Sequence, residues 1–375
     1  MPASAPALAE TRLGVEVDSL AVSAYTIPTD APESDGTLEW DSTTIVVVEA
    51  HGGDETGLGY TYGPRAVGVL VEELLAEVAT GAEAGAPVAV WHAAGARLRN
   101  AGRPGIGFMA LSAVDLALWD LKARLLELPL VDVLPRAHDA VPVYGSGGFC
   151  SYSLERIAEQ LRGWVEQGLA RVKMKVGRAP AEDTARLDAA REAIGWETEL
   201  FVDANGAFAR KQALAWAELY VRDWGVRWFE EPVSSADFEG LRLLRDHALD
   251  GLEIAAGEYA YVPADFRNLI EHGCVDCLQA DVTRCGGITG LLGAAGLAAA
   301  HNLQVSGHCA PQLGAHAFCA VPNLRHLEYF HDHVRIERML FDGVLEPIGG
   351  ELRPDRTRPG HGLELKRADA ERYAA

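Results

Sequence analysis

The stretch RVKMKVGRAPAEDTARLDAAREAIGWETELFVD, residues 171–203, decides the fold of this chain. It opens with a short apolar strand, Arg171–Val176, and continues as an amphipathic helix over Ala181–Ile194. A second strand, Leu200–Asp203, ends the stretch on a carboxylate. A strand, a helix and another strand of these lengths predict one unit of an alternating α/β fold.

The same alternation recurs over residues 141–330, with amphipathic helices such as Ser153–Glu166, Lys211–Asp223 and Ile288–His301 between the strands. The eight expected strands are Val141–Gly145, Arg171–Val176, Leu200–Asp203, Val226–Glu230, Leu252–Gly257, Val275–Asp281, Leu303–Gly307 and Leu324–Phe330. This pattern predicts an α/β protein with a (β/α)₈ TIM barrel. A doubly wound open sheet is the alternative, but Gly145-Ser-Gly-Gly only partly matches its usual G-x-G-x-x-G.

The N-terminal part of the chain has a different pattern. Residues 13–18 and 42–49 predict strands, and Ala66–Val78 and Ala110–Leu126 predict helices. Thr29–Gly36 and His51–Gly63 are expected to be long loops, which often cover sites. We therefore expect an N-terminal α+β domain at residues 1–135, the barrel at residues 136–340, and a segment at residues 341–375 that returns to the first domain.

Composition bounds the class of protein. The 375 residues are 49% hydrophobic and 23% charged, as in a folded soluble chain of two domains. A net charge of -21 disfavours nucleic-acid binding. The start, MPASAPALAE, does not resemble a signal peptide, and no apolar run is long enough to span a membrane. Cys274 and Cys277 lack partners for a zinc site and read as core residues, so we expect a reducing cytoplasm.

The ends of the expected strands carry polar side chains. In such a barrel, chemistry lies at the C-terminal ends of the strands. Any one such residue is more often a helix cap, a solvated tip or a structural histidine. Burying so many charges together without purpose would be costly, so their common position indicates a site. The residues are Lys173, Lys175, Asp203, Asn205, Glu230, Glu231, Glu258, Asp281, His308 and Glu328.

Three carboxylates at one point of this rim predict a metal site. Asp203, Glu258 and one of Glu230 and Glu231 would repel each other unless a cation lay among them. Ligation by oxygen alone favours Mg²⁺ over zinc. A substrate carboxylate could occupy an open position on the metal, which would stabilise the dianionic enolate formed when the α-proton leaves.

Two further pairs of residues supply candidate bases. Lys173 and Lys175 are two apart on a strand and point into the barrel together. The proximity of two ammonium groups is expected to lower the pKa of one lysine toward neutral, as a general base requires. Asp281 and His308 end adjacent strands, where the carboxylate would fix the imidazole tautomer. The lysine and the histidine could flank a substrate from opposite faces.

The motifs at these positions match those of a known family. They are Val172-Lys-Met-Lys-Val-Gly, Val202-Asp-Ala-Asn-Gly, Phe229-Glu-Glu-Pro, Ala256-Gly-Glu, Gln279-Ala-Asp with Gly286-Gly-Ile-Thr-Gly, Ser306-Gly-His and Ser112-Ala-Val-Asp-Leu-Ala-Leu-Trp-Asp. Together they resemble the mandelate racemase subgroup of the enolase superfamily. The resemblance implies a modified barrel with an N-terminal α+β capping domain, whose two loops close over the substrate. It also implies a symmetric homo-oligomer.

The resemblance also implies roles for the rim residues. One Mg²⁺ per active site would be held by Asp203, Glu230 and Glu258, which selects Glu230 over its neighbour. Lys175 would be one acid/base and the His308–Asp281 dyad the other. The remaining contacts would come from Lys173, which touches the substrate carboxylate and tunes Lys175, from Asn205 beside the metal, and from Glu328, which hydrogen-bonds the substrate carboxylate or the enolate.

Two bases and a metal fit several reactions of a small carboxylate. Dehydration of an acid sugar to a 2-keto-3-deoxy acid is favoured, and racemisation, epimerisation and lactone cycloisomerisation are the alternatives. A non-catalytic sugar-acid binder is a remote one, because no ligand or base is missing. The loop from Thr29 has three acidic residues and no arginine, which disfavours a second substrate carboxylate there, although Arg335 and Arg338 could supply one elsewhere. His331 and His333 are expected to be a surface loop pair rather than substrate or metal contacts.

Overall fold

The computed structural model describes residues 14–375, and its centre is a closed barrel of eight parallel strands. Each strand pairs with the next one along the chain, and β11 pairs back with β4. All eight expected strands are present, and the open-sheet alternative is wrong because the sheet closes. The strands are β4 (Val141–Gly147), β5 (Arg171–Lys175), β6 (Glu199–Asp203), β7 (Val226–Glu230), β8 (Glu253–Ala256), β9 (Cys277–Ala280), β10 (Gln304–Gly307) and β11 (Leu324–Phe330).

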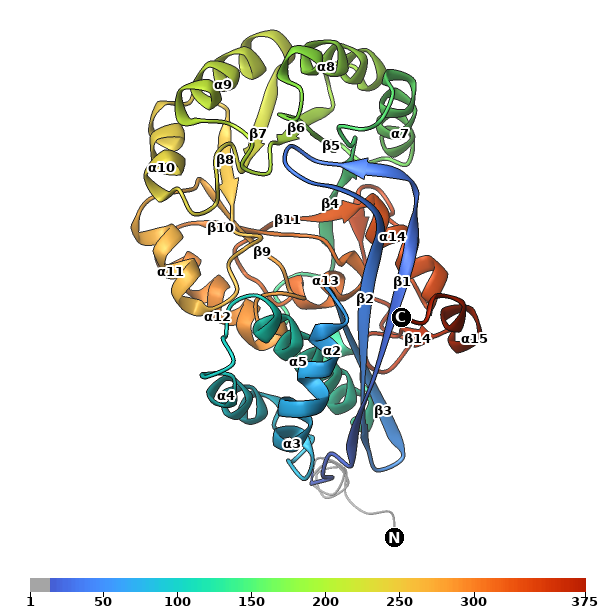
Figure 1. Ribbon diagram of the computed structural model, residues 1–375. Coiled ribbons are helices and arrows are strands. Elements are labelled where there is room, and N and C mark those ends of the chain that lie inside the picture. Colours follow the sequence, from blue (N-terminus) through green and yellow to red (C-terminus); the bar gives the residue numbers. More distant parts are fainter. Residues whose placement is uncertain (1–13) are drawn as a thin grey trace.

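A helix follows each barrel strand and packs on the outside of the ring (Figure 1). In α7, Ser153 caps the first turn, and the ring of Trp164 lies where a Cβ on Gly145 would have to be, at 2.3 Å. The helix can therefore rest directly on β4 because that position has no side chain. The helices are α7 (Leu154–Glu166), α8 (Pro180–Ile194), α9 (Arg210–Trp224), α10 (Phe238–His247), α11 (Pro263–Glu271), α12 (Gly287–Ala300), α13 (Pro311–Phe318) and α14 (His331–Leu340).

The N-terminal region is an antiparallel three-stranded sheet with helices on one side. The strands β1 and β2 form a long hairpin that reaches from this region to the mouth of the barrel (Figure 1). The sheet comprises β1 (Ser19–Ser34), β2 (Glu39–Gly52) and β3 (Glu55–Tyr62). The helices are α2 (Ala66–Leu70), the π-helix η1 (Val71–Leu75), α3 (Ala76–Ala79), α4 (Pro87–Arg97), α5 (Ile106–Leu125) and α6 (Leu130–Val133).

Both loops expected in this region are wrong. Most of Thr29–Gly36 continues β1, with an irregular register between Pro28 and Glu33. His51–Gly63 is the turn from β2 and the strand β3. Its glycines serve packing, since a Cβ on Gly57 would lie 2.1 Å from the carbonyl oxygen of Ala117. Gly59 meets α5 in the same way, so the sheet lies against the helix backbone.

The strand expected at residues 13–18 is also wrong. Leu13 lies outside the described residues, Glu16 makes only an isolated bridge to Glu83, and β1 begins at Ser19. The ladder starts there because Ser19 is the first residue that registers with β2, opposite His51. By contrast, Cys274 and Cys277 are buried and form no disulfide bond, as expected.

The chain after α14 contacts both the barrel and the N-terminal region. Arg124 donates to Glu364 at 2.7 Å, and His361 Nε2 lies 2.7 Å from the carbonyl oxygen of Leu58. These contacts agree with the expected return of the segment, whose exact boundaries stay a prediction. Its elements are β12 (Phe341–Asp342), β13 (Glu351–Leu352), which pairs with β4, β14 (Glu364–Leu365), α15 (Arg367–Ala370) and η2 (Glu371–Tyr373). No helix in residues 14–375 has the length and apolarity needed to cross a membrane.

Candidate active site

Three carboxylates meet at the C-terminal ends of neighbouring barrel strands. Asp203 ends β6, Glu230 ends β7, and Glu258 follows β8. All three are buried, and one oxygen from each lies within 4.8 Å of the others. The backbone N–H of Asn205 donates to Asp203 at 2.9 Å, and the Trp228 indole N–H donates to Glu230 at 3.0 Å. These bonds fix the orientation of two of the carboxylates.

The carboxylate trio has the chemistry of a divalent-cation site. Burial, together with the charge of Asp203, raises the pKa of Glu230 to about 7, which reflects the cost of holding these charges side by side. An all-oxygen set of buried carboxylates suits Mg²⁺. Glu231 is not in the trio and leaves the strand with a positive φ of 39°. The trio therefore contains Glu230 and not Glu231, and the role of Glu230 as a metal ligand stays a prediction.

The two lysines of β5 lie against the trio. Lys173 donates to Glu230 at 2.6 Å and also contacts Glu328 at 2.8 Å. Lys175 forms an ion pair with Asp203 at 2.5 Å.

The expected drop in a lysine pKa is not found, because the pKa values of both Lys173 and Lys175 are raised. Burial and the Lys173 ammonium lower the pKa of Lys175, but Asp203 and the other carboxylates raise it further, to well above its ordinary value. The pKa of Lys173 is likewise raised, because Glu230, Glu328 and Asp203 together outweigh the effect of burial. The carboxylates that hold these protons are the same ones that would ligate a cation.

Opposite the lysines, Asp281 and His308 form the expected dyad. His308 Nδ1 donates to Asp281 at 2.7 Å, and Thr283 donates to the other Asp281 oxygen through its backbone N–H and its hydroxyl, both at 2.7 Å. His308 Nε2 lies 3.1 Å from Glu258. Burial lowers the pKa of His308, but Cys309, Glu258, Glu328 and the bond to Asp281 together raise it well above normal.

Glu328, near the end of β11, completes the ring. Its Oε1 accepts from Ser146 at 2.5 Å, and its Oε2 accepts from the backbone N–H of Cys309 at 3.0 Å. Burial raises its pKa, but Lys173 and His308 lower it to well below normal. Glu328 is therefore a fixed, charged acceptor.

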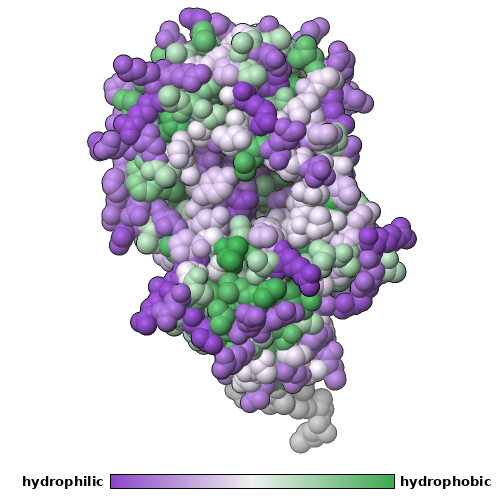
Figure 2. Space-filling model, in the orientation of Figure 1, coloured by the Kyte–Doolittle hydropathy of each residue, from purple (hydrophilic) through white to green (hydrophobic). Residues whose placement is uncertain are grey.

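The site opens into a cavity of about 350 Å³ between the barrel rim and the N-terminal hairpin. Figure 2 shows a hollow near the middle of this face. The expected site residues that line the cavity are Lys175, Asn205, Glu258, His308 and Glu328. The remaining expected residues are buried beneath them, namely Lys173, Asp203, Glu230 and Asp281. The N-terminal region contributes Asp35, Trp40, Ser42, Thr43, Thr44, Tyr62, Gly63 and Pro64 to the opposite wall.

The tip of the β1–β2 hairpin presses on the rim. A Cβ on Gly36 would lie 2.2 Å from the carbonyl oxygen of Ala204 and 2.8 Å from that of Val176. These two residues directly follow Asp203 and Lys175 in the chain. The tip can therefore reach the ends of β5 and β6 only because Gly36 has no side chain.

His333 contradicts the expectation of a surface loop pair. It lies in the first turn of α14, is 6% exposed and lines the cavity. Its Nδ1 accepts the backbone N–H of Ala310 at 3.2 Å, and its ring stacks on Tyr62 with centroids 3.4 Å apart. Burial lowers its pKa to about 3, so the ring is neutral. Because α14 begins immediately after β11, the histidine points into the barrel mouth rather than into a surface loop.

The sequence did not identify several other cavity residues. Arg284 contacts the carbonyl of Glu258 at 3.2 Å and the Asp281 carboxylate at 3.4 Å, and Cys309 lies beside His308. Arg284 could have been found from its place in the Asp281-Val-Thr-Arg turn, three residues after the strand end. No periodic signal marks the contributions of the hairpin.

Comparisons with known proteins were consistent with one another. Residues 22–135 match the mandelate racemase/muconate lactonizing enzyme N-terminal domain, and residues 156–370 match the enolase C-terminal domain-like family. A mandelate racemase/muconate lactonizing enzyme-like protein from Rubrobacter xylanophilus is 63% identical, with a TM-score of 0.95 over 96% of this chain and 100% of that one.

Two characterised relatives are more distant. The 3,6-anhydro-alpha-L-galactonate cycloisomerase of Streptomyces coelicolor is 32% identical over 93% of this chain and 97% of its own. A mutant L-talarate/galactarate dehydratase from Salmonella typhimurium, with Mg and L-glucarate bound, is 29% identical with a TM-score of 0.88, over 100% of this chain and 95% of that one. The chain thus belongs to the mandelate racemase/muconate lactonizing enzyme family of the enolase superfamily.

Proposed function

We propose that this protein is a Mg²⁺-dependent enzyme that abstracts the α-proton of a carboxylate substrate and dehydrates an acid sugar to a 2-keto-3-deoxy acid. One observation carries the proposal. Lys175 contacts Asp203 at one end of the carboxylate trio, and His308 contacts Glu258 at the other. Two proton-transfer groups therefore face one cavity from opposite sides of a cation site.

The metal would be held by Asp203, Glu230 and Glu258, one ion per active site. A Mg²⁺ ion there would offset the carboxylate charge that holds the Lys175 proton and would polarise the substrate carboxylate. Asn205 lies next to this site, and its side-chain oxygen accepts no hydrogen bond from the described residues, which leaves it available to a ligand.

The reaction uses groups that the fold fixes in advance. Lys175 would take the α-proton. His308, whose pKa is raised, would as the imidazolium give its own proton to the departing β-hydroxyl, which leaves as water. Asp281 holds the imidazole in place through Nδ1. Lys173 would contact the substrate carboxylate or the enolate oxygens. Glu328, linked to Lys173 at 2.8 Å, would hydrogen-bond these oxygens only as a protonated acid.

The far wall of the cavity favours a substrate with a single carboxylate. It consists of hydroxyl, aromatic and backbone groups from the hairpin, with Asp35 as its only charged side chain among the described lining residues of the N-terminal region. Arg284 is already engaged by Glu258 and Asp281. Arg335 pairs with Asp332 and does not line this cavity. A polyhydroxy chain fits this wall better than a second carboxylate does.

Cycloisomerisation of a lactone or related ring is the second candidate. The similarity to a cycloisomerase over 93% of this chain favours it, and the same two proton-transfer groups would serve it. Racemisation or epimerisation would use the same pair without a leaving group. Because all the proposed ligands and bases are present, a non-catalytic binder is the least supported function.

We further propose that the enzyme works in the cytoplasm as a homo-oligomer. None of the cysteines in the described chain forms a disulfide bond, which suits a reducing compartment. A hydrophobic area lies over the N-terminal helices around α2 and α5 in Figure 2, and such an area suits contact with another copy.

A library of mono- and diacid sugars, assayed for 2-keto acid product with Mg²⁺, tests the reaction. We expect product from monoacids, with much less from diacids. Product from lactones alone would support the cycloisomerase, and no product from any substrate would overturn dehydration. In deuterated water, Lys175→Ala and His308→Asn should lose α-proton exchange with opposite substrate epimers. Identical exchange patterns in the two variants would overturn the two-base mechanism.

A further inference from the structure

A second group of potential metal ligands lies where the hairpin meets the outside of the barrel mouth. Asp30 and Glu33 come from β1, and His331 is the first residue of α14. One ligand atom from each lies within 4.8 Å of the others. Within residues 14–375, the two other groups of this kind both belong to the central site. This peripheral group therefore has no role in the proposed reaction.

One carboxylate oxygen of Glu33 lacks a hydrogen-bond partner among the described residues. Its side chain is fully buried, and its Oε2 accepts the indole N–H of Trp40 at 2.9 Å. Its Oε1 accepts no hydrogen bond from any described residue. Burial and the charge of Asp332 raise the pKa of Glu33 to about 8. A buried carboxylate oxygen without a donor is costly, and a bound cation there would offset this cost.

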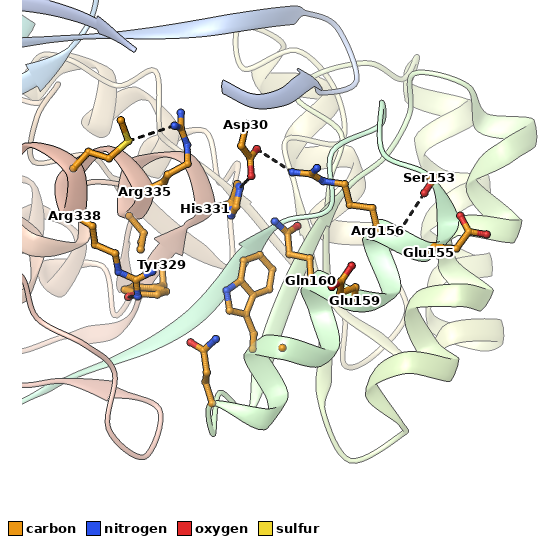
Figure 3. Close-up of a pocket in the computed structure, with 15 residues that line it drawn as sticks. Asp30, Ser153, Glu155, Arg156, Glu159, Gln160, Tyr329, His331, Arg335 and Arg338 are labelled. Carbon is orange, nitrogen blue, oxygen red and sulfur yellow. Dashed lines mark hydrogen bonds and ion pairs between the residues drawn. The ribbon is translucent and has the colours of Figure 1, made fainter. Parts of the chain in front are cut away.

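The neighbouring arginines do not meet this need. Arg156 pairs with Asp30 at 2.9 Å, and Arg335 pairs with Asp332 at 2.7 Å. Figure 3 shows Asp30 between Arg156 and His331. After these pairings, Glu33 is the carboxylate left over.

His331 supplies the nitrogen ligand of the group. Its Nε2 lies 3.2 Å from Asp30. Burial lowers its pKa more than Asp30 raises it. A groove of about 840 Å³ is lined by Asp30 and His331 and gives a route from solvent.

We propose that Asp30, Glu33 and His331 form a second cation site, which takes a divalent transition-metal ion of the Zn²⁺ class. One imidazole nitrogen and two carboxylate oxygens form a mixed set that suits Zn²⁺ better than Mg²⁺, which prefers oxygen alone. Water would fill the remaining position.

The position of the ligands gives the ion a structural role. Two ligands lie on the hairpin that covers the central cavity, and the third lies on the barrel. Two hydrogen bonds also join the hairpin to the barrel here. Arg335 donates to the carbonyl of Pro28, and Ser151 donates to the carbonyl of Pro32, both at 2.7 Å. An ion bound there fastens the hairpin to the barrel in its closed position, and its binding stabilises the folded protein.

The test is calorimetric titration of the full chain with Zn²⁺ in the presence of excess Mg²⁺. It uses the Glu258→Gln background, which removes one ligand of the carboxylate trio and leaves His308, Cys309 and Glu328 in place. We expect a Zn²⁺ site whose affinity falls at least about tenfold after Glu33→Gln or His331→Gln, a loss of one ligand in three. Co²⁺ in the same background should give an absorption spectrum that His331→Gln abolishes.

Unchanged Zn²⁺ affinity in both ligand variants would overturn the proposal, as would no binding in the Glu258→Gln protein. In the second case the buried Glu33 carboxyl would hold a proton instead. If Glu33→Gln does not fold, Asp30→Asn provides the same test at a partly exposed position. None of these readouts depends on turnover, so the site can fail while the proposed reaction stands, and the reverse also holds.

Discussion

The barrel rim and the β1–β2 hairpin face each other across one cavity, but they are built on different rules. The rim repeats one strand and one helix at a time, so each functional side chain lies at the end of a strand. The hairpin has no such repeat, and its role depends on what it touches far away in the chain, as Gly36 touches Ala204. The rim carries the groups proposed to break the bond, and the hairpin shapes and closes the space above them.

The largest expected effect lies on the rim. Glu258→Gln removes a ligand charge from the trio, and we expect Mg²⁺-dependent turnover to fall by about 10³-fold or more. Steady-state kinetics across a Mg²⁺ titration measures this fall. Glu253→Gln is the matched control, because it lies at the other end of the same strand and pairs with Arg325. Near-normal activity in Glu258→Gln would show that the carboxylate trio on the rim is not needed for the reaction.

The hairpin should show a smaller effect of a different kind. Gly36→Ala places a Cβ against the carbonyl oxygen of Ala204 and displaces the tip. We expect kcat/KM to fall by about 10²-fold with little change in thermal stability, because the reacting groups remain but the cavity is misshapen. Leu38→Ala, at an exposed position of the same tip, should behave like the wild type. Equal activity in the two variants would show that closure of the hairpin is not needed.

These two regions also differ in how well the sequence predicted them. Strand alternation placed Asp203, Glu258 and His308 on one rim because period and position suffice in a barrel. The glycines of His51–Gly63 were interpreted as loop residues, although Gly57 and Gly59 exist to let α5 approach the sheet. Their function depends on a helix more than fifty residues away. Sequence pattern alone does not contain that contact.

The pKa of Lys175 shows the same limit in electrostatics. Proximity to Lys173 was expected to lower it, and Lys173 does so. The sequence could not show that Asp203 would lie within ion-pair distance, where its effect outweighs the neighbouring ammonium. The direction of a shift at a crowded site requires all the distances, because the contributions oppose each other.

The contact between α14 of the barrel and β3 of the N-terminal sheet can be tested by pH. Burial raises the pKa of Glu337 to about 8, although the Tyr60 hydroxyl donates to it at 2.6 Å. Between about pH 4.5 and 8 the unfolded chain loses this proton before the folded protein does, so stability falls as pH rises. Glu337→Gln should flatten this fall by about 1 kcal/mol or more in denaturant titrations at pH 5 and 8. The exposed Glu218→Gln is the control, and parallel pH curves would contradict the prediction.

The smallest effect is expected on the outer helices, away from both regions. In α12 a Cβ on Gly293 meets nothing within 4 Å, whereas one on Gly290 would lie 1.9 Å from the carbonyl oxygen of Cys285. Gly293→Ala should therefore stabilise the protein by about 0.5–1 kcal/mol without changing activity, and Gly290→Ala should destabilise it. Thermal unfolding measures both. If both variants changed the stability in the same direction, the space around each glycine would not be what determines the effect.

The pairing of β11 with β4 has a consequence for synthesis of the chain. Until Leu324–Phe330 has left the ribosome, β4 and β10 each lack a neighbour on one side, and the barrel has two open edges. Glu328 belongs to that last strand, so the ammonium of Lys173 lacks one of its carboxylate partners until then. The ring of proposed catalytic groups is thus assembled only near the end of translation. A nascent chain that pauses earlier exposes strand edges to its neighbours, and for that interval a chaperone has the most to protect.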